Sequence, residues 1–193
     1  MNNIKAFFND IAKYWDNAED DISRISTLLD ELNIKNGDMV LDVGCGKGII
    51  TPILHDKSQS KVLAIDISEE MIKGAIEAHK DNDQLEFICG DFLETGFNNK
   101  FDYIVIFNAY PHFMDTAKLN DAVYKALRKG GRFAIVHSIG RAELNTHHKQ
   151  HAMGVSRPLE EASIEAKKFE AKFKIEKCLE NANSYLIVLQ KII

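Results

Sequence analysis

Short apolar runs alternate along most of the chain with segments whose apolar residues recur at three- and four-residue spacings. An all-apolar run is typical of a strand buried on both faces, and the three-and-four spacing is typical of an amphipathic helix. The runs predict strands at residues 40–43, 62–66, 85–89, 101–107, 132–137, 173–179 and 184–191. The spaced segments predict helices at 4–16, 21–32, 115–130 and 158–173, with others beginning after Gly48 and at Ser68. This alternation predicts an α/β domain.

The first predicted strand runs into three alternating glycines, Gly44, Gly46 and Gly48, and Asp42 precedes them. Glycine permits positive φ and close approach, and the helix that follows offers unpaired backbone N–H groups. We interpret the stretch as a ligand-binding turn, with a glycine-rich turn that binds nothing as the alternative. Its spacing differs from that of dinucleotide sites, and Asp42 would repel a diphosphate. Asp66 ends the next strand and can accept ribose hydroxyls, so a cationic nucleoside fits both acids better.

Four segments, taken in order, resemble those of the class I S-adenosylmethionine-dependent methyltransferases of the small-molecule type. Residues 40–48 resemble the glycine motif of that family, and Asp66 falls where the family binds ribose. Residues 89–92 resemble its adenine-contacting segment, and residues 127–133 resemble the loop before its fifth strand. The resemblance implies a Rossmann-like sheet of seven strands, mostly parallel, with helices on both faces and a C-terminal antiparallel hairpin.

The resemblance also implies S-adenosyl-L-methionine as the cofactor and S-adenosyl-L-homocysteine as its product. It places Asp42 and Gly44 against the methionine end, Asp66 on the ribose, and Asp91 with Phe92 on the adenine. For Asp91 the alternative is a helix or turn cap. The residues expected to contact the cofactor are Tyr14, Trp15, Asp42, Gly44, Cys45, Gly46, Asp66, Ile67, Met71, Gly90, Asp91, Phe92 and Asn108.

The N-terminal segment is aromatic and amphipathic, and it resembles the lead-in of many small-molecule members. Its apolar residues share one helical face by their spacing, and they are Phe7, Phe8, Ile11, Tyr14 and Trp15. The functional interpretation is a lid in which Tyr14 or Trp15 shields the adenosine or the sulfonium, because aromatic faces attract cations. The alternative is a helix that packs on the core.

The segment after the fourth strand, residues 108–115, lies where small-molecule members carry acceptor-facing residues. It lacks the proline directly after Asn108 that methyltransferases acting on amino groups of nucleic-acid bases or glutamine carry, which argues against that chemistry. His112 is a candidate general base because imidazole titrates near neutral pH, with a hydrogen-bonded loop histidine as the alternative. The side chains expected to bind the acceptor are Tyr110, His112, His137, Arg141, His147 and His148.

Four of the expected functional histidines, His137, His147, His148 and His151, cluster late in the chain. If residues 145–151 are helical, His147 and His151 share a face, as two metal ligands do at i,i+4. No glutamate accompanies the pair as in a zinc-protease helix, so we expect no metal. The alternative to an enzyme is a non-catalytic sensor that keeps the cofactor fold and binds a metal or metabolite through these histidines. A nucleotide-dependent oxidoreductase is disfavoured by the glycine spacing.

Length and charge narrow the protein class further. The 193 residues suit one domain, with residues 1–32 as a helical lid or cap and 33–193 as the core. A net charge of −5 argues against a nucleic-acid partner. No apolar run is long enough to span a membrane, and the N-terminus lacks a signal-peptide pattern. Three cysteines without a CxxC spacing indicate reduced thiols and a cytoplasmic protein. The sequence leaves open whether the protein is a monomer or a homodimer.

Overall fold

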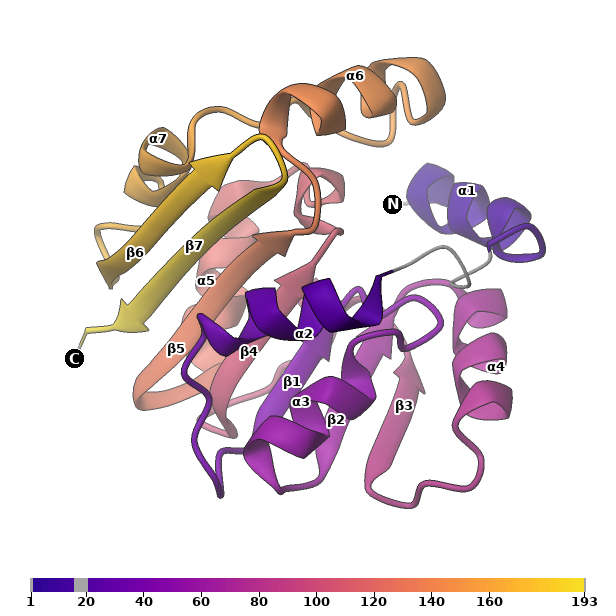
Figure 1. The fold of residues 1–193 in the computed structure, drawn as a ribbon, viewed down its shortest axis with the longest axis horizontal. Coiled ribbons are helices and arrows are strands. Elements are labelled where there is room, and N and C mark those ends of the chain that lie inside the picture. Colours follow the sequence, from indigo (N-terminus) through magenta and orange to yellow (C-terminus); the bar gives the residue numbers. More distant parts are fainter. Residues whose placement is uncertain (1, 16–20, 193) are drawn as a thin grey trace.

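The computed structural model describes residues 2–15 and 21–192. Its centre is a sheet of seven strands in the order β3-β2-β1-β4-β5-β7-β6 (Figure 1). Strands β1 to β5 pair in parallel, and β7 runs antiparallel between β5 and β6. This confirms the predicted fold class. The strands are β1 (Val40–Val43), β2 (Val62–Asp66), β3 (Leu85–Cys89), β4 (Phe101–Phe107), β5 (Leu127–His137), β6 (Phe173–Asn181) and β7 (Ser184–Lys191).

Seven α-helices and two short 3₁₀ helices are assigned within the described residues. Ser68 and Asp115 cap two of them as the sequence predicts, because their side chains accept the backbone N–H of Met71 and Lys118. The helices are α1 (Asn2–Ala12), α2 (Ile22–Asp30), α3 (Thr51–Ser58), α4 (Glu69–Ala78), η1 (Phe92–Glu94), η2 (Tyr110–His112), α5 (Thr116–Ala126), α6 (Arg141–His151) and α7 (Ala162–Lys167).

Helices cover both faces of the sheet because successive strand residues point to opposite sides. On one face Val40 of β1 packs with apolar residues of α2 and α3. On the other face Leu41 and Val43 pack with residues of α5 and α7. Helix α1 belongs to neither layer and lies beside the N-terminal end of α4 (Figure 1). Residues 1–32 thus contain the two expected helices, and the apolar side of α2 packs against the sheet.

Three predicted boundaries were wrong. Helix α1 ends at Ala12, short of the predicted end at residue 16, which itself lies outside the described residues. Strand β5 begins at Leu127, because residues 127–131 continue the pairing with β4 through a bulge that contains Gly130 at φ 73°. The helix predicted at 158–173 is reduced to α7. Side-chain acceptors on Asn145 and Glu165 hold the backbone of the preceding residues in an extended segment.

The structure bears on two expectations from the sequence, the lack of a membrane-spanning segment and the reduced state of the cysteines. Among residues 2–15 and 21–192, no helix combines the length and the apolar character that crossing a membrane requires. The thiols of Cys45, Cys89 and Cys178 are free, with Cys45 buried and Cys89 exposed.

Candidate functional site

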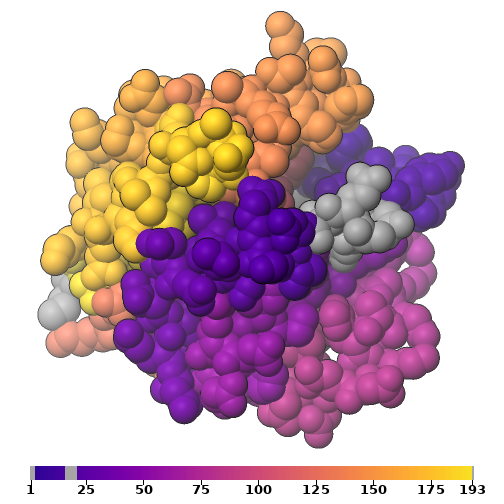
Figure 2. All heavy atoms as spheres, viewed as in Figure 1, coloured from indigo at the N-terminus to yellow at the C-terminus, as the bar shows by residue number. Residues whose placement is uncertain are grey.

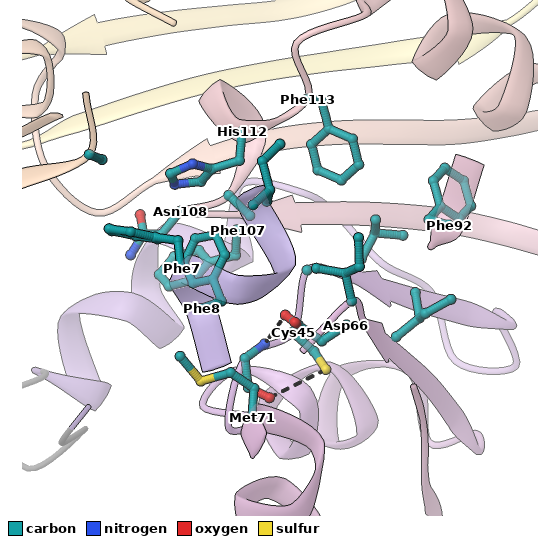
Figure 3. A pocket seen from close by; sticks show the side chains of 18 of the residues that line it. Phe7, Phe8, Cys45, Asp66, Met71, Phe92, Phe107, Asn108, His112 and Phe113 are labelled. Carbon is teal, nitrogen blue, oxygen red and sulfur yellow. Dashed lines mark hydrogen bonds between the residues drawn. The ribbon is translucent and has the colours of Figure 1, made fainter. Parts of the chain in front are cut away.

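A cavity of about 830 Å³ opens at the carboxyl ends of the central strands (Figure 3). The strand order changes direction beside β1: the chain adds β2 and β3 on one side of β1, and then β4 and β5 on the other. Ligands of open α/β sheets bind at such a switch point. The volume is typical of a small-molecule site. Residues from the ends of β1, β2 and β4 form its floor, and α1, η2 and α6 form its outer walls.

The three glycines after β1 have different structural roles. All have positive φ, at 71° for Gly44, 54° for Gly46 and 78° for Gly48. A Cβ at Gly44 would lie 2.7 Å from the Cβ of Ala109, and one at Gly48 would lie 2.8 Å from the Phe87 ring. A Cβ at Gly46 would meet no atom within 4 Å, and Gly46 lines the cavity. Packing therefore requires the outer two glycines, whereas Gly46 leaves open the space that a ligand would enter.

Asp42 is a fully buried carboxyl at the floor of the cavity. Its Oδ2 accepts a hydrogen bond from the Thr51 hydroxyl at 2.7 Å. Its Oδ1 is buried without a hydrogen-bond partner among the described residues. The pKa of Asp42 is raised to about 7, chiefly by burial; the Thr51 hydrogen bond opposes the rise and the nearby Asp66 adds to it. A cationic group beside Oδ1 would offset the cost of this buried carboxylate.

Asp66 ends β2 and links the glycine turn to the start of α4. Its Oδ2 accepts the backbone N–H of Gly46 at 2.9 Å (Figure 3). Its Oδ1 accepts the backbone N–H of Ser68 at 2.8 Å. Burial raises the pKa of Asp66, and these backbone donors oppose the rise. Each carboxylate oxygen has two lone pairs, so both can accept one further hydrogen bond from a diol.

Asp91 follows β3 and resembles Asp42 in having one unused oxygen. Its Oδ1 accepts the N–H of Leu93 at 2.9 Å, which caps η1. Its Oδ2 is buried and has no hydrogen-bond partner within the described chain. The cap interpretation is thus confirmed, and it leaves one oxygen available to a ligand. The remaining cofactor candidates that line the cavity are Cys45, Ile67, Met71, Gly90 and Phe92.

Helix α1 forms a wall of the cavity through Ile4, Phe7, Phe8 and Ile11. Asn9 fastens the helix to the start of α4: its Oδ1 accepts the Ser68 hydroxyl at 2.7 Å, and its Nδ2 donates to Glu69 at 3.1 Å.

Trp15 also lines the cavity, but Tyr14 does not. Tyr14 is 79% exposed. Because α1 ends at Ala12, the helical spacing that would place Tyr14 on the apolar face no longer applies. Tyr14 therefore lies away from the cavity that the other expected cofactor contacts line.

His112 lines the cavity, as do three histidines of α6. The His112 ring lies 4.8 Å from the Phe8 ring and 5.1 Å from the His148 ring, measured between centroids. The rings of His147 and His151 lie one turn apart on α6, with centroids 4.8 Å apart and planes tilted by 45°, which confirms their shared helical face. Burial lowers the pKa of His112, and it lowers that of His148 to about 4. These two imidazoles are therefore neutral at physiological pH.

Three expected acceptor-binding residues lie outside the cavity. The Tyr110 side chain is fully buried, and its hydroxyl donates to Glu165 at 2.8 Å. The apolar run that forms β5 continues through His137, which is also fully buried. Arg141 pairs with Glu180 at 2.6 Å, on a different part of the surface. The structure thus places these three side chains away from the cavity walls.

Asn108 lines the cavity but uses its side chain within the protein. Its Nδ2 donates to the Ser138 hydroxyl at 3.0 Å, and its Oδ1 accepts the Ser138 N–H at 2.9 Å. Asn108 has φ 53°, a conformation that asparagine tolerates better than most residues. The side chain therefore joins the ends of β4 and β5.

A metal site was the alternative for the histidines. Within the described part of the chain, no three His, Cys, Asp or Glu side chains are grouped so that they could hold a metal ion. The sensor hypothesis therefore gains no support from the structure.

Sequence reasoning missed most of the apolar wall. These residues are Ile4, Ile49, Ile50, Phe107, Phe113, Met114, Ile139, Leu144 and Ala152. Apolar residues at strand ends and in loops carry no chemical signal, so only the spacing of Phe7 and Phe8 could have pointed to this wall.

Comparison with known proteins places this geometry in a family. The sequence matches the model of the family described as "Methyltransferase domain" over residues 34–184. It is 31% identical over 112 residues to malonyl-[acyl-carrier protein] O-methyltransferase of Acetivibrio thermocellus, covering 56% of this chain and 39% of that protein. It is 30% identical over 122 residues to sterol 24-C-methyltransferase of Saccharomyces cerevisiae, covering 61% and 32%. The chain thus spans well under two thirds of these relatives.

Solved structures share the fold. The chain is similar to a SAM-dependent methyltransferase from Aquifex aeolicus, with a TM-score of 0.73, 21% identity, and coverage of 90% of this chain and 95% of that one. It is also similar to Haemonchus contortus phosphoethanolamine N-methyltransferase 2 in complex with S-adenosyl-L-methionine, with a TM-score of 0.71 and 19% identity. That match covers 89% of this chain and 52% of the other.

Proposed function

This chain belongs to the class I S-adenosylmethionine-dependent methyltransferase family, and we propose that it transfers a methyl group from S-adenosyl-L-methionine to a small molecule. The observation that carries the proposal is the set of unused polar groups around an open cradle. Gly46 leaves room for a ligand, and the buried oxygens Asp42 Oδ1 and Asp91 Oδ2 have no hydrogen-bond partner among the described residues. Buried polar atoms without partners are rare, so each calls for a ligand or a water.

The residues present fit the cofactor in charge as well as in shape. Asp66 would accept the ribose hydroxyls, Asp91 would accept a hydrogen bond from the adenine, and Asp42 would face the methionine end. Four carboxyls line the cavity, and they are Asp42, Asp66, Asp91 and Asp115. The two lysines there are already paired with protein oxygens. The resulting negative field favours a cationic ligand.

When bound, the cofactor would supply an activated methyl group, so the chain mainly has to hold the acceptor in line with it and exclude water. Phe7, Phe8 and Ile11 of α1 would exclude water from the cavity. His112 would orient the acceptor and take up its proton if it carries one.

The names of the relatives support a small-molecule acceptor without identifying it. They refer to malonyl-[acyl-carrier protein], sterol and phosphoethanolamine as the molecules that those proteins methylate. A cytoplasmic location and the division into a cap of residues 1–32 and a core of 33–193 stay predictions.

Gly46→Ala is expected to weaken S-adenosylhomocysteine binding by about tenfold or more, because the added methyl group occupies the cradle and overpacking costs about 1–3 kcal/mol. Calorimetric titration measures the change. Gly96→Ala is the matched control: Gly96 has φ 66° and a Cβ there also meets open space, but it lies outside the cavity. The control should lose similar stability and keep its affinity. Equal affinities for the two variants would count against the proposed cradle.

A further inference from the structure

One wall of the cavity combines aromatic rings with imidazoles from three separate elements. Phe8 of α1 contacts the His112 ring of η2 edge-on, with ring planes at 89°. The His112 ring also lies 5.1 Å from the His148 ring of α6, between centroids, and Leu144 lies one helical turn before His148. Figure 3 shows His112 above Phe7 and Phe8, at a distance from Asp66. An acceptor on this wall would thus meet apolar surface and imidazole nitrogens.

A backbone contact fixes the tautomer of His112. Its Nδ1 lies 2.8 Å from the carbonyl oxygen of Val155. A carbonyl can only accept a hydrogen bond, so Nδ1 carries the proton and Nε2 keeps a free lone pair. Burial lowers the pKa of His112, so the ring is neutral in the free protein. His112 therefore offers a hydrogen-bond acceptor.

His148 supplies a second unused nitrogen beside the first. Its side chain is 8% exposed, it lines the cavity, and its Nδ1 is buried without a hydrogen-bond partner within the described chain. Its ring is also neutral, since burial and the neighbouring His112 lower its pKa to about 4. A neutral imidazole has one donor and one acceptor nitrogen. The pair can thus accept one hydrogen bond and donate another to the same atom.

The charges around the cavity disfavour an anionic acceptor. Of the described residues that line it, Lys47 and Lys118 are the side chains with a fixed positive charge. Lys47 donates to the carbonyl of Trp15 at 2.7 Å, and Lys118 is paired with Glu94. Arg141 lies outside the cavity and pairs with Glu180. The four aspartates outnumber these lysines, so a carboxylate or phosphate would enter a net negative field.

We propose that His112 and His148 select an uncharged aromatic acceptor through a single hydroxyl group, which donates to Nε2 of His112 and accepts from His148. The ring of the acceptor packs against Phe7, Phe8 and Leu144. This inference rests on the proposed function and specifies its acceptor class.

The transfer balances with these groups. The hydroxyl proton passes to Nε2 of His112 while the hydroxyl oxygen forms a bond to the methyl carbon. The carbon–sulfur bond of the donor breaks, and its electron pair stays on the sulfur, which becomes a neutral thioether. The imidazolium of His112 then returns the proton to solvent.

A matched pair of probes tests the acceptor class. The protein is first titrated with S-adenosylhomocysteine by calorimetry, and the complex is then titrated with 2-naphthol or with 2-naphthoate, which share a ring system. We expect 2-naphthol to bind at millimolar concentration or below and 2-naphthoate to bind at least about tenfold more weakly, because the carboxylate meets unpaired acceptors. Equal or tighter binding of 2-naphthoate, or no binding of 2-naphthol, overturns the inference.

Variants link the preference to the two imidazoles. His112→Phe and His148→Phe should each weaken 2-naphthol binding by about tenfold, since each removes one hydrogen bond and keeps a ring of similar shape. His79→Phe is the control, because His79 stacks on Phe87 and does not line the cavity. Unchanged 2-naphthol binding in both test variants contradicts the role of the pair. If S-adenosylhomocysteine itself fails to bind wild-type protein, the proposed function falls instead.

Discussion

Asp66→Ala is expected to weaken S-adenosylhomocysteine binding by about a hundredfold or more. The carboxylate would accept both ribose hydroxyls, and a hydrogen bond to a charged group contributes about 1.5–3 kcal/mol. The same change removes the acceptor for the backbone N–H groups of Gly46 and Ser68, so the glycine turn also loses its anchor. Calorimetric titration of the purified variant measures the loss.

Two further variants separate binding from folding. Asp66→Asn keeps one oxygen acceptor and the shape of the side chain, so it should lose less affinity than Asp66→Ala. Asp56→Ala removes an exposed aspartate of α3 and should leave the affinity unchanged. If thermal unfolding shows that Asp66→Ala is folded and it still binds as tightly as Asp56→Ala, the ribose assignment is wrong.

Ligand affinity is expected to rise as the pH increases from about 4 toward about 7, by up to about tenfold per pH unit near the lower end. The cause is Asp42, whose pKa burial raises from 3.8 to about 7. Below about pH 7 the carboxyl of the free protein is therefore protonated. A cationic methionine end favours the ionised carboxylate, and binding therefore releases the proton. Calorimetry of S-adenosylmethionine in buffers of different ionisation enthalpy measures that release. An affinity that is flat across this range contradicts the role of Asp42.

The same shift gives a stability prediction of the opposite sign. Because the folded carboxyl has the higher pKa, its contribution to folding is present below about pH 4 and is lost as the pH rises through about 7. Asp42→Asn keeps an acceptor for the Thr51 hydroxyl and removes the buried charge. At pH above 7 this variant should unfold at a higher temperature than wild type, bind S-adenosylmethionine less tightly, and release no proton.

The cofactor end of the cavity could be predicted because its chemistry is local in sequence. Glycines at alternate positions after an apolar strand imply a turn, and acids at the ends of neighbouring strands meet at one edge of the sheet. The expected order of the strands was therefore enough to predict that Asp42, Gly46 and Asp66 lie close together. The distinct roles of the glycines were not predictable, because Ala109 and Phe87, which crowd Gly44 and Gly48, are distant in sequence.

The acceptor end was predicted less well because it depends on side-chain direction. His137 follows the apolar residues of β5 into the core, and Tyr110 is buried against Glu165, although both are polar residues near the ends of strands. Arg141 is the first residue of α6, and its guanidinium donates to Glu180 of β6, which lies 39 positions away in sequence. By contrast, His112 and His148 come together because η2 and α6 both border the cavity. Figure 2 shows α6, in orange, near α1, in indigo, on one side of the molecule.

Calorimetric titration of the wild-type protein with S-adenosylhomocysteine is the decisive measurement for the proposed function. We expect saturable binding at one site per chain with micromolar affinity, weakened by about tenfold or more in Gly46→Ala but not in Gly96→Ala. Absence of binding at high micromolar concentration to folded wild-type protein would contradict it.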